Sequence, residues 1–221
     1  LALMPYWREG RRLMGRSTVT ERDLLPMSRG ALRGPLPIDA QGRCTSIAVG
    51  TYANDHHYPG EDWPLAPKSV RWGGRWSGTP FCIPFDALIS DAIPNLVLAE
   101  KGFSVSHMAN GATRLQPLIL NLGQVAGLAA AMAVRQGCDL GDLAVESIQS
   151  ALIHEPHAPA AVLPIWDWPH WHPHWVAAQE QGLAQPELLD AKGCLSDIEA
   201  SMLMPPGMNQ APHQAHEVGL S

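Results

Sequence analysis

Two titratable side chains lie close together in a segment rich in polar and aromatic residues. Asp55 and His57 are two positions apart, so on an extended chain their side chains point to the same face. A carboxylate and an imidazole on one face suit general acid–base catalysis. Hydrogen bonding within the loop is the alternative use of the same pair. The glycines and prolines of residues 55–78 predict a long covering or functional loop around them.

A second group of charged residues lies near the N-terminus. Arg8, Glu9, Arg11 and Arg12 fall within five positions. Guanidinium groups bind carboxylates through two parallel hydrogen bonds, so this cluster could hold a substrate carboxylate. A solvated surface, or salt bridges between domains, is the commoner reason for such a cluster.

A stretch dense in tryptophan and histidine, residues 166–175, invites a metal-site interpretation. Its histidines alternate and would point the same way on a strand, but two prolines interrupt any regular strand, and the only carboxylate within it is Asp167. We therefore predict an aromatic strap that binds no metal and packs on the domain surface or against a missing part of the protein.

Composition restricts the class of protein. The 221 residues carry a formal net charge of −6, and 46% of them are apolar, which argues against a nucleic-acid-binding protein and against a disordered chain. The four cysteines form no C-x-x-C pair, and the N-terminal residues lack the order of a signal peptide. A reducing, cytoplasmic setting is therefore the expectation.

Charged residues are scarce. They make up 16% of the chain, where about 25% is usual, so we expect part of the surface to be covered by something else, such as more chain, a subunit or a cofactor. The first residue, Leu1 rather than Met, agrees with that expectation. Residues 1–150 hold 14 basic and 13 acidic side chains, whereas residues 151–221 hold one and eight. This shift predicts a boundary near residue 150, followed by an irregular strap and a frayed tail.

Short β-prone runs and helix signals alternate in the first 150 residues, which predicts an α/β or α+β fold. We expect strands at 46–52, 81–85 and 95–99, the last of them a continuous apolar run. Thr20 with Asp23 predicts a short capped helix. An amphipathic helix is expected over 142–153, with Leu143, Ile148 and Leu152 facing inward.

The longest predicted element is a helix over residues 117–136. It begins with Pro117 and contains 18 residues without a charge, up to Val134; Gly137 then ends it. Such a run meets the lower limit for a membrane span, but its many small residues and two amides favour a core helix. We therefore expect one long buried helix packed on the strand at 95–99, and no membrane partner.

The order of motifs around this helix resembles the C-terminal flavin-binding segment of the FAD-dependent oxidoreductase family. The resemblance covers roughly residues 6–150. The residues that carry it are Asn95-Leu-Val-Leu-Ala99, Ser104-Val-Ser-His107, Gly111-Ala-Thr-Arg114-Leu-Gln-Pro117 and Gly123-Gln-Val-Ala-Gly127, with similar blocks upstream at 6–12, 20–25, 46–50, 55–57 and 80–85.

The resemblance implies FAD as the cofactor and a set of contacts to it. The cofactor-binding candidates are Glu100, Gly111, Arg114, Leu115, Gln116, Pro117 and Gly123. The helix start at Pro117 and the charge of Arg114 would lie where reduced flavin carries negative charge; a surface ion pair is the alternative for Arg114. His107 is a candidate catalytic proton donor, or else a satisfied core histidine. Glu100-Lys101 departs from the family, which more often has Gly followed by Arg.

The resemblance also implies a second unit. The family holds the FAD pyrophosphate on a glycine-rich strand-to-helix turn, and no G-x-G-x-x-G occurs in this sequence. We therefore expect a missing N-terminal FAD-binding half, in the same chain or encoded by a split gene. With it, the protein would remove a hydride from a small organic substrate. The alternative is a non-catalytic structural or partner-binding fragment of the same fold.

Overall fold

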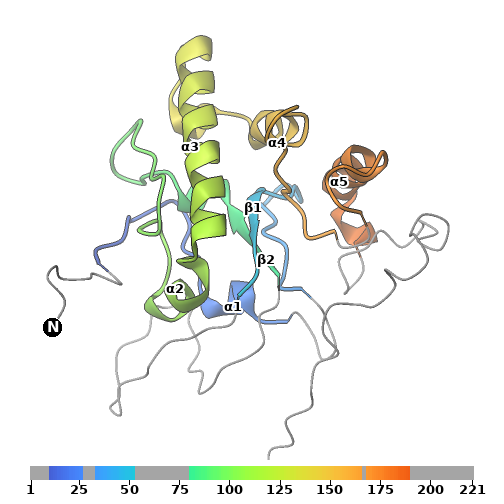
Figure 1. Cartoon of the computed structure of the whole chain (residues 1–221). Coiled ribbons are helices and arrows are strands. Elements are labelled where there is room, and N and C mark those ends of the chain that lie inside the picture. The colour runs from blue at the N-terminus through green and yellow to red at the C-terminus, as the bar shows by residue number, and fades with distance from the viewer. Residues whose placement is uncertain (1–9, 27–32, 53–79, 166–167, 190–221) are drawn as a thin grey trace, which may run out of the picture.

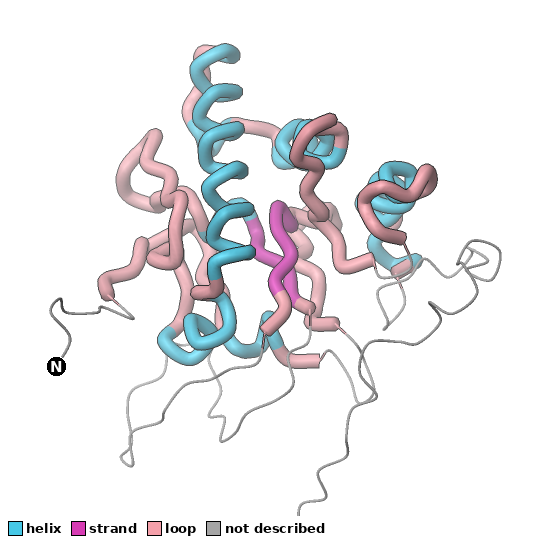
Figure 2. Tube along the Cα trace, viewed as in Figure 1, coloured by secondary structure: helices cyan, strands magenta, loops and turns pink. Residues whose placement is uncertain are grey.

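A computed structural model describes residues 10–26, 33–52, 80–165 and 168–189 of the chain. Five helices and two strands lie in these ranges, in a mixed α+β arrangement (Figure 1, Figure 2). Their bounds are α1 Glu21–Leu24, β1 Ser46–Gly50, β2 Phe81–Pro84, α2 His107–Thr113, α3 Gln116–Gln136, α4 Val145–Ile153 and α5 Trp175–Ala184. The loop over 55–78 and the tail beyond 190 lie outside the described residues.

The two strands form an antiparallel pair in the centre of the described structure. Val49 pairs with Cys82 and Gly50 with Phe81, and the register shifts between Ser46 and Ala48. Nearly all of their side chains are buried, as continuous apolar runs bounded by turn residues predict. The strands expected at 46–52 and 81–85 are therefore confirmed, with slightly shorter bounds.

Local capping signals also predict α1 correctly. The backbone N–H of Thr20 donates to Asp23 Oδ2 at 2.7 Å, which is half of a capping box. The amphipathic helix expected over 142–153 is also confirmed. Helix α4 buries Ile148 and Leu152, as the pattern predicts.

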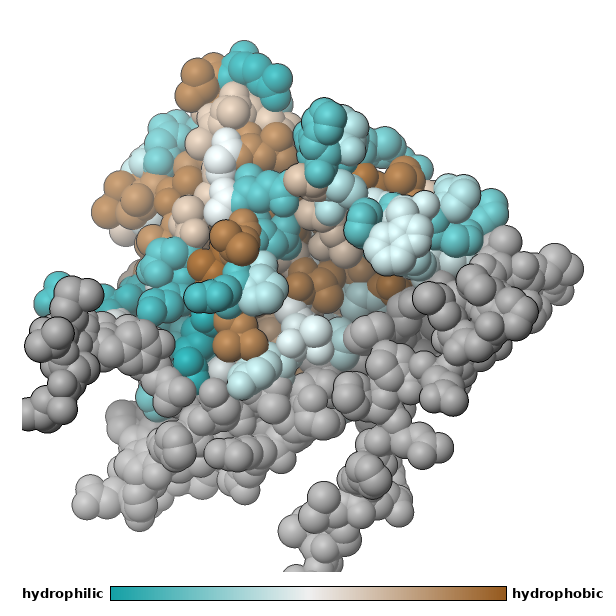
Figure 3. All heavy atoms as spheres, in the orientation of Figure 1, coloured by the Kyte–Doolittle hydropathy of each residue, from teal (hydrophilic) through white to brown (hydrophobic). Residues whose placement is uncertain are grey.

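Helix α3 forms as one unbroken element, and its ends follow from its sequence. Pro117 lies in its first turn, and Gly137 ends it in the left-handed region at φ 65°, with its N–H donating to the carbonyls of the last turn. One face packs against β1. The opposite face is open: Leu120 is 76% and Val134 83% exposed, and hydrophobic and pale residues cover much of α3 in Figure 3. The expected complete burial is therefore wrong for this face.

The strand expected at 95–99 does not form. Asn95 adopts a left-handed backbone at φ 61°, which breaks an extended run at its first residue. The following residues pair only locally: Val97 bridges Ile89, and Leu98 N–H donates to Leu88 O at 2.8 Å. Helix α3 consequently packs on β1. By length and composition α3 is also apolar enough to cross a membrane, and the absence of a membrane partner stays a prediction.

The hydrophobic core continues beyond residue 150. Val162, Leu163, Trp168 and Trp175 are buried in the same cluster as the strands. Two tryptophans of the aromatic strap therefore pack in the core, whereas Trp171 is 74% exposed. A buried polar network holds this region: Ser46 Oγ donates to Val162 O at 2.5 Å, and Gln149 Nε2 donates to Ser46 O at 2.8 Å. The boundary near residue 150 stays a prediction.

Two buried cysteines predict a fall in stability at high pH. Burial raises the pKa of Cys44 to about 11 and that of Cys82 to about 12. Above pH 9 the unfolded chain releases these protons while the folded chain keeps them, so the free energy of unfolding falls by about 1 kcal/mol per pH unit for each thiol, between pH 9 and 11. Urea denaturation across this range measures it. In the double variant Cys44→Ala/Cys82→Ala the slope should be shallower by about 2 kcal/mol per pH unit, because both thiols are removed; an unchanged slope would show that other groups cause it.

Candidate functional site

The N-terminal end of α3 is open to a ligand. Its N-cap residue is Leu115, an extended residue (φ −79°, ψ 145°) whose aliphatic side chain cannot cap the helix. Gln116 and Pro117 in the first turn are exposed. The first N–H groups of a helix lack intrahelical partners, and the helix dipole makes this end positive. This end of α3 can therefore hold a hydrogen-bond acceptor or a partial negative charge.

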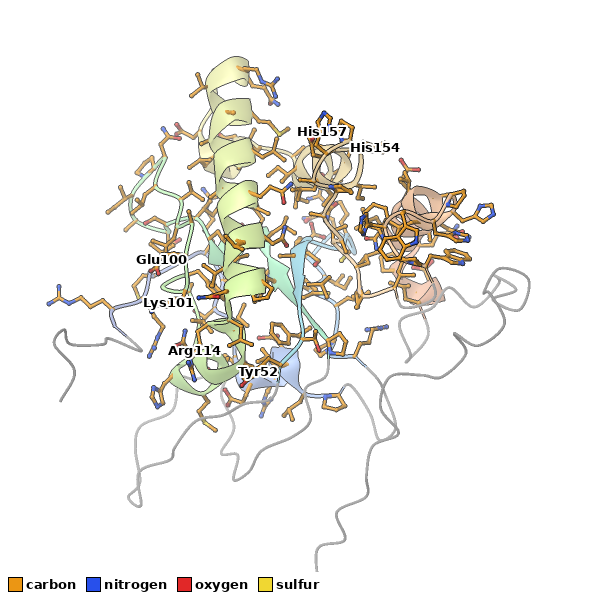
Figure 4. The ribbon with its side chains drawn as sticks, in the orientation of Figure 1. Tyr52, Glu100, Lys101, Arg114, His154 and His157 are labelled. Carbon is orange, nitrogen blue, oxygen red and sulfur yellow. The ribbon has the colours of Figure 1, made fainter. Side chains whose placement is uncertain are left out.

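A short connection from α2 places two polar side chains at this end. Thr113, the last residue of α2, is fully buried, and its Oγ1 has no hydrogen-bond partner among the described residues. Arg114 follows it and is half-buried. Figure 4 shows Arg114 at the junction between α2 and α3. The structure thus brings together the candidates Arg114, Leu115, Gln116 and Pro117, and adds Thr113.

The loop over residues 99–102 lies against the same part of the molecule. Ala99 O lies 3.7 Å from the position of a Cβ built on Gly123, and Asn110 Nδ2 donates to Lys101 O at 3.2 Å. Figure 4 shows Glu100 and Lys101 beside the lower part of α3, on the side of Arg114. The loop is therefore held between α2 and the second turn of α3.

Glu100 has a local structural role. Its side chain is exposed, and Oε1 accepts a hydrogen bond from Gly102 N–H at 3.0 Å. The carboxylate therefore stabilises its own turn. Gly123 is half-buried opposite this loop, and Gly111 is buried within α2. Contact between these three residues and a cofactor remains a prediction.

His107 lies at the first position of α2 and is exposed. The alternative of a core histidine is therefore wrong, while its catalytic role stays a prediction. The preceding residue, Ser106, is buried and makes two hydrogen bonds. Its Oγ accepts from Ala109 N–H at 3.1 Å and donates to Glu21 Oε2 at 3.1 Å. Glu21 is fully buried. This contact fixes the start of α2, and with it the position of His107.

Two candidate catalytic residues, Asp55 and His57, lie outside the described residues. Tyr52 is the last described residue before them in the sequence. It follows β1 and is 36% exposed. Figure 4 shows Tyr52 near the base of α3, at the same end of the molecule as Arg114.

Sequence reasoning missed Tyr52, Thr113 and Asn110 as parts of this site. Tyr52 carried a usable signal, because it ends a β-prone run just before Asp55. Thr113 and Asn110 carried none, since only their burial and their contacts distinguish them.

A family model matches the part of the chain that contains these residues. Residues 1–152 match the family model described as FAD dependent oxidoreductase. No curated protein and no solved structure matches. The matched range covers more than two thirds of the 221 residues and includes β1, β2, α2 and α3 with every candidate cofactor and catalytic residue. The chain therefore belongs to the FAD dependent oxidoreductase family.

Proposed function

We propose that this chain forms the flavin-ring and substrate side of an oxidoreductase that removes a hydride from a small organic substrate. A separate dinucleotide-binding unit would complete the FAD site. The observation that carries the proposal is the open N-terminal end of α3, with Arg114 and the buried Thr113 hydroxyl beside it.

The residues at this end fit one edge of the flavin ring. The edge around N1 and the C2 oxygen offers hydrogen-bond acceptors and becomes more negative when the flavin is reduced. The first turn of α3 supplies the N–H groups of Gln116 and Leu118, since Pro117 has none, together with the positive end of the helix dipole. Arg114 supplies a full positive charge. Buried hydroxyls are rarely left without a partner, so a ligand atom near Thr113 Oγ1 would also account for that side chain.

The sequence lacks the glycine-rich motif that the family uses to bind the FAD pyrophosphate. No G-x-G-x-x-G occurs anywhere in its 221 residues, and this turn is what normally binds the two phosphates at a helix N-terminus. A glycine-rich FAD-binding unit, in the same polypeptide or as a split subunit, is therefore part of the proposal.

The proposed mechanism assigns separate tasks to the residues of this chain. The chemistry that FAD supplies when bound is acceptance of a hydride from a substrate carbon. The first turn of α3 and Arg114 stabilise the negative charge that develops at the adjacent ring edge. His107, exposed at the start of α2, takes or gives the substrate proton at an imidazole nitrogen. Asp55 and His57 are proposed for the same acid–base work.

Titration of the isolated chain with FAD and with riboflavin tests whether this chain contacts only the flavin ring and a separate unit binds the pyrophosphate. Because the proposed contacts are to the ring, FAD and riboflavin should bind with affinities within about threefold of each other, and weakly. Fluorescence quenching measures both affinities. Gel filtration should separate the flavin from the protein. A chain that retains one FAD per molecule through gel filtration would contradict the proposal and require a phosphate site in this sequence.

A further inference from the structure

A polar cavity of about 110 Å³ lies between the loop of residues 89–96 and the 3-10 helix η2 (Leu140–Asp142). Its lining includes one basic side chain, Arg16, and three acidic ones, Asp91, Asp139 and Asp142. Helix η2 follows the C-terminal end of α3, whereas the proposed flavin edge lies at the N-terminal end. The 21 residues of α3 span about 30 Å, so the cavity belongs to a different part of the molecule.

Asn95 fixes the two walls of this cavity to each other. Its Nδ2 donates to Asp139 Oδ1 at 2.6 Å, and its Oδ1 accepts from Leu140 N–H at 3.1 Å. Its left-handed backbone, at φ 61°, turns the loop toward η2; asparagine tolerates this conformation better than most residues. The cavity is therefore preformed.

Arg16 is held in place by one hydrogen bond, which leaves most of its donors available. Nη1 donates to Gly141 O at 3.1 Å, and a Cβ built on Gly141 would overlap the guanidinium. Only glycine therefore lets the guanidinium lie here. Within the described ranges Arg16 has no ion-pair partner, although three aspartates line the same cavity. Asp91 and Asp142 likewise make no side-chain hydrogen bond to any described residue.

The four charged side chains are exposed at this cavity, so they are available to a ligand that carries both a negative and a positive charge. A carboxylate would match the planar fork of Arg16, and an ammonium group would match Asp91 and Asp142. An anion alone would face three carboxylates, and a cation alone would leave Arg16 unmatched. The volume admits only a small molecule. We infer that this cavity binds a small zwitterionic amino acid, such as glycine or alanine.

Calorimetric titration of the full chain with glycine, acetate and methylammonium tests this inference. Glycine should bind with a Kd of roughly 1–10 mM, as suits a ligand of five heavy atoms, and both half-ligands should bind at least tenfold more weakly. Methylammonium or acetate binding as tightly as glycine would overturn the zwitterion assignment. Absence of glycine binding at about 100 mM would overturn the site.

Three variants locate the binding. Arg16→Gln should abolish it, and Gly141→Ala, which displaces the guanidinium but keeps its charge, should weaken it at least tenfold. Gly127→Ala is the matched control, because a Cβ there meets nothing within 4 Å; it should leave glycine binding unchanged. Thermal unfolding of each variant checks the fold. Equal glycine affinity in Gly141→Ala and Gly127→Ala would overturn the assignment of Arg16.

Discussion

Replacing Gln179 with leucine is expected to lower the free energy of unfolding by about 3–5 kcal/mol. The Gln179 side chain is fully buried in α5, and Oε1 accepts from the N–H groups of Val162 at 3.1 Å and Leu163 at 2.9 Å. Its Nε2 donates to Leu163 O at 3.0 Å. Leucine would leave both N–H groups without partners inside an apolar core, at a cost of about 1–3 kcal/mol each before relaxation. Leu163 O would keep only its hydrogen bond from Ile165 N–H at 2.9 Å. Urea denaturation measures the change.

A neighbouring glutamine supplies the control for this substitution. Gln181 lies in the same helix but is exposed, so Gln181→Leu should change the free energy of unfolding by no more than about 0.5 kcal/mol. A loss below about 1 kcal/mol in Gln179→Leu would show that the 162–163 backbone finds other partners. The segment would then not depend on α5 for its position beside β1.

Replacing Arg114 with alanine is expected to lower the two-electron reduction potential of the flavin by about 30–65 mV in the FAD-loaded protein reassembled with its N-terminal FAD-binding unit. Its positive charge beside the first turn of α3 should stabilise reduced flavin more than oxidised flavin. A charge-assisted hydrogen bond contributes about 1.5–3 kcal/mol, which converts to that range for two electrons. Potentiometric titration measures the shift.

Two further variants separate the roles at this site. Arg135→Ala removes a charge from the last turn of α3, about 30 Å away along the helix, and should leave the potential unchanged. His107→Ala should slow turnover of the substrate without moving the potential, because an acid–base residue acts on the substrate proton. If the reduction potential in Arg114→Ala stays within a few millivolts of that of the parent protein, Arg114 has only a structural role. The helix dipole alone would then stabilise the reduced flavin.

Elements that depend on local signals could be predicted from the sequence. Pro117 and Gly137 mark the two ends of α3 because their backbone preferences act within one turn. Thr20 and Asp23 cap α1 for the same reason. The run at 95–99 has the apolar composition of a strand, but composition cannot provide a hydrogen-bonding neighbour, and Asn95 adopts a left-handed conformation that regular strands avoid.

The candidate site also combines features that the sequence predicts with features that only the tertiary structure decides. The sequence by itself determined the family-like order of motifs and the placement of Arg114 just before the uncharged run at 117–134. Only the tertiary structure decided that His107 is exposed, that Glu100 bonds within its own turn, and that Thr113 lies buried beside Arg114. Burial and hydrogen-bond partners depend on segments far apart in the chain, such as the Ser106–Glu21 contact across 85 positions. No local pattern specifies them, because the free energy of such contacts arises only when the distant segments pack together.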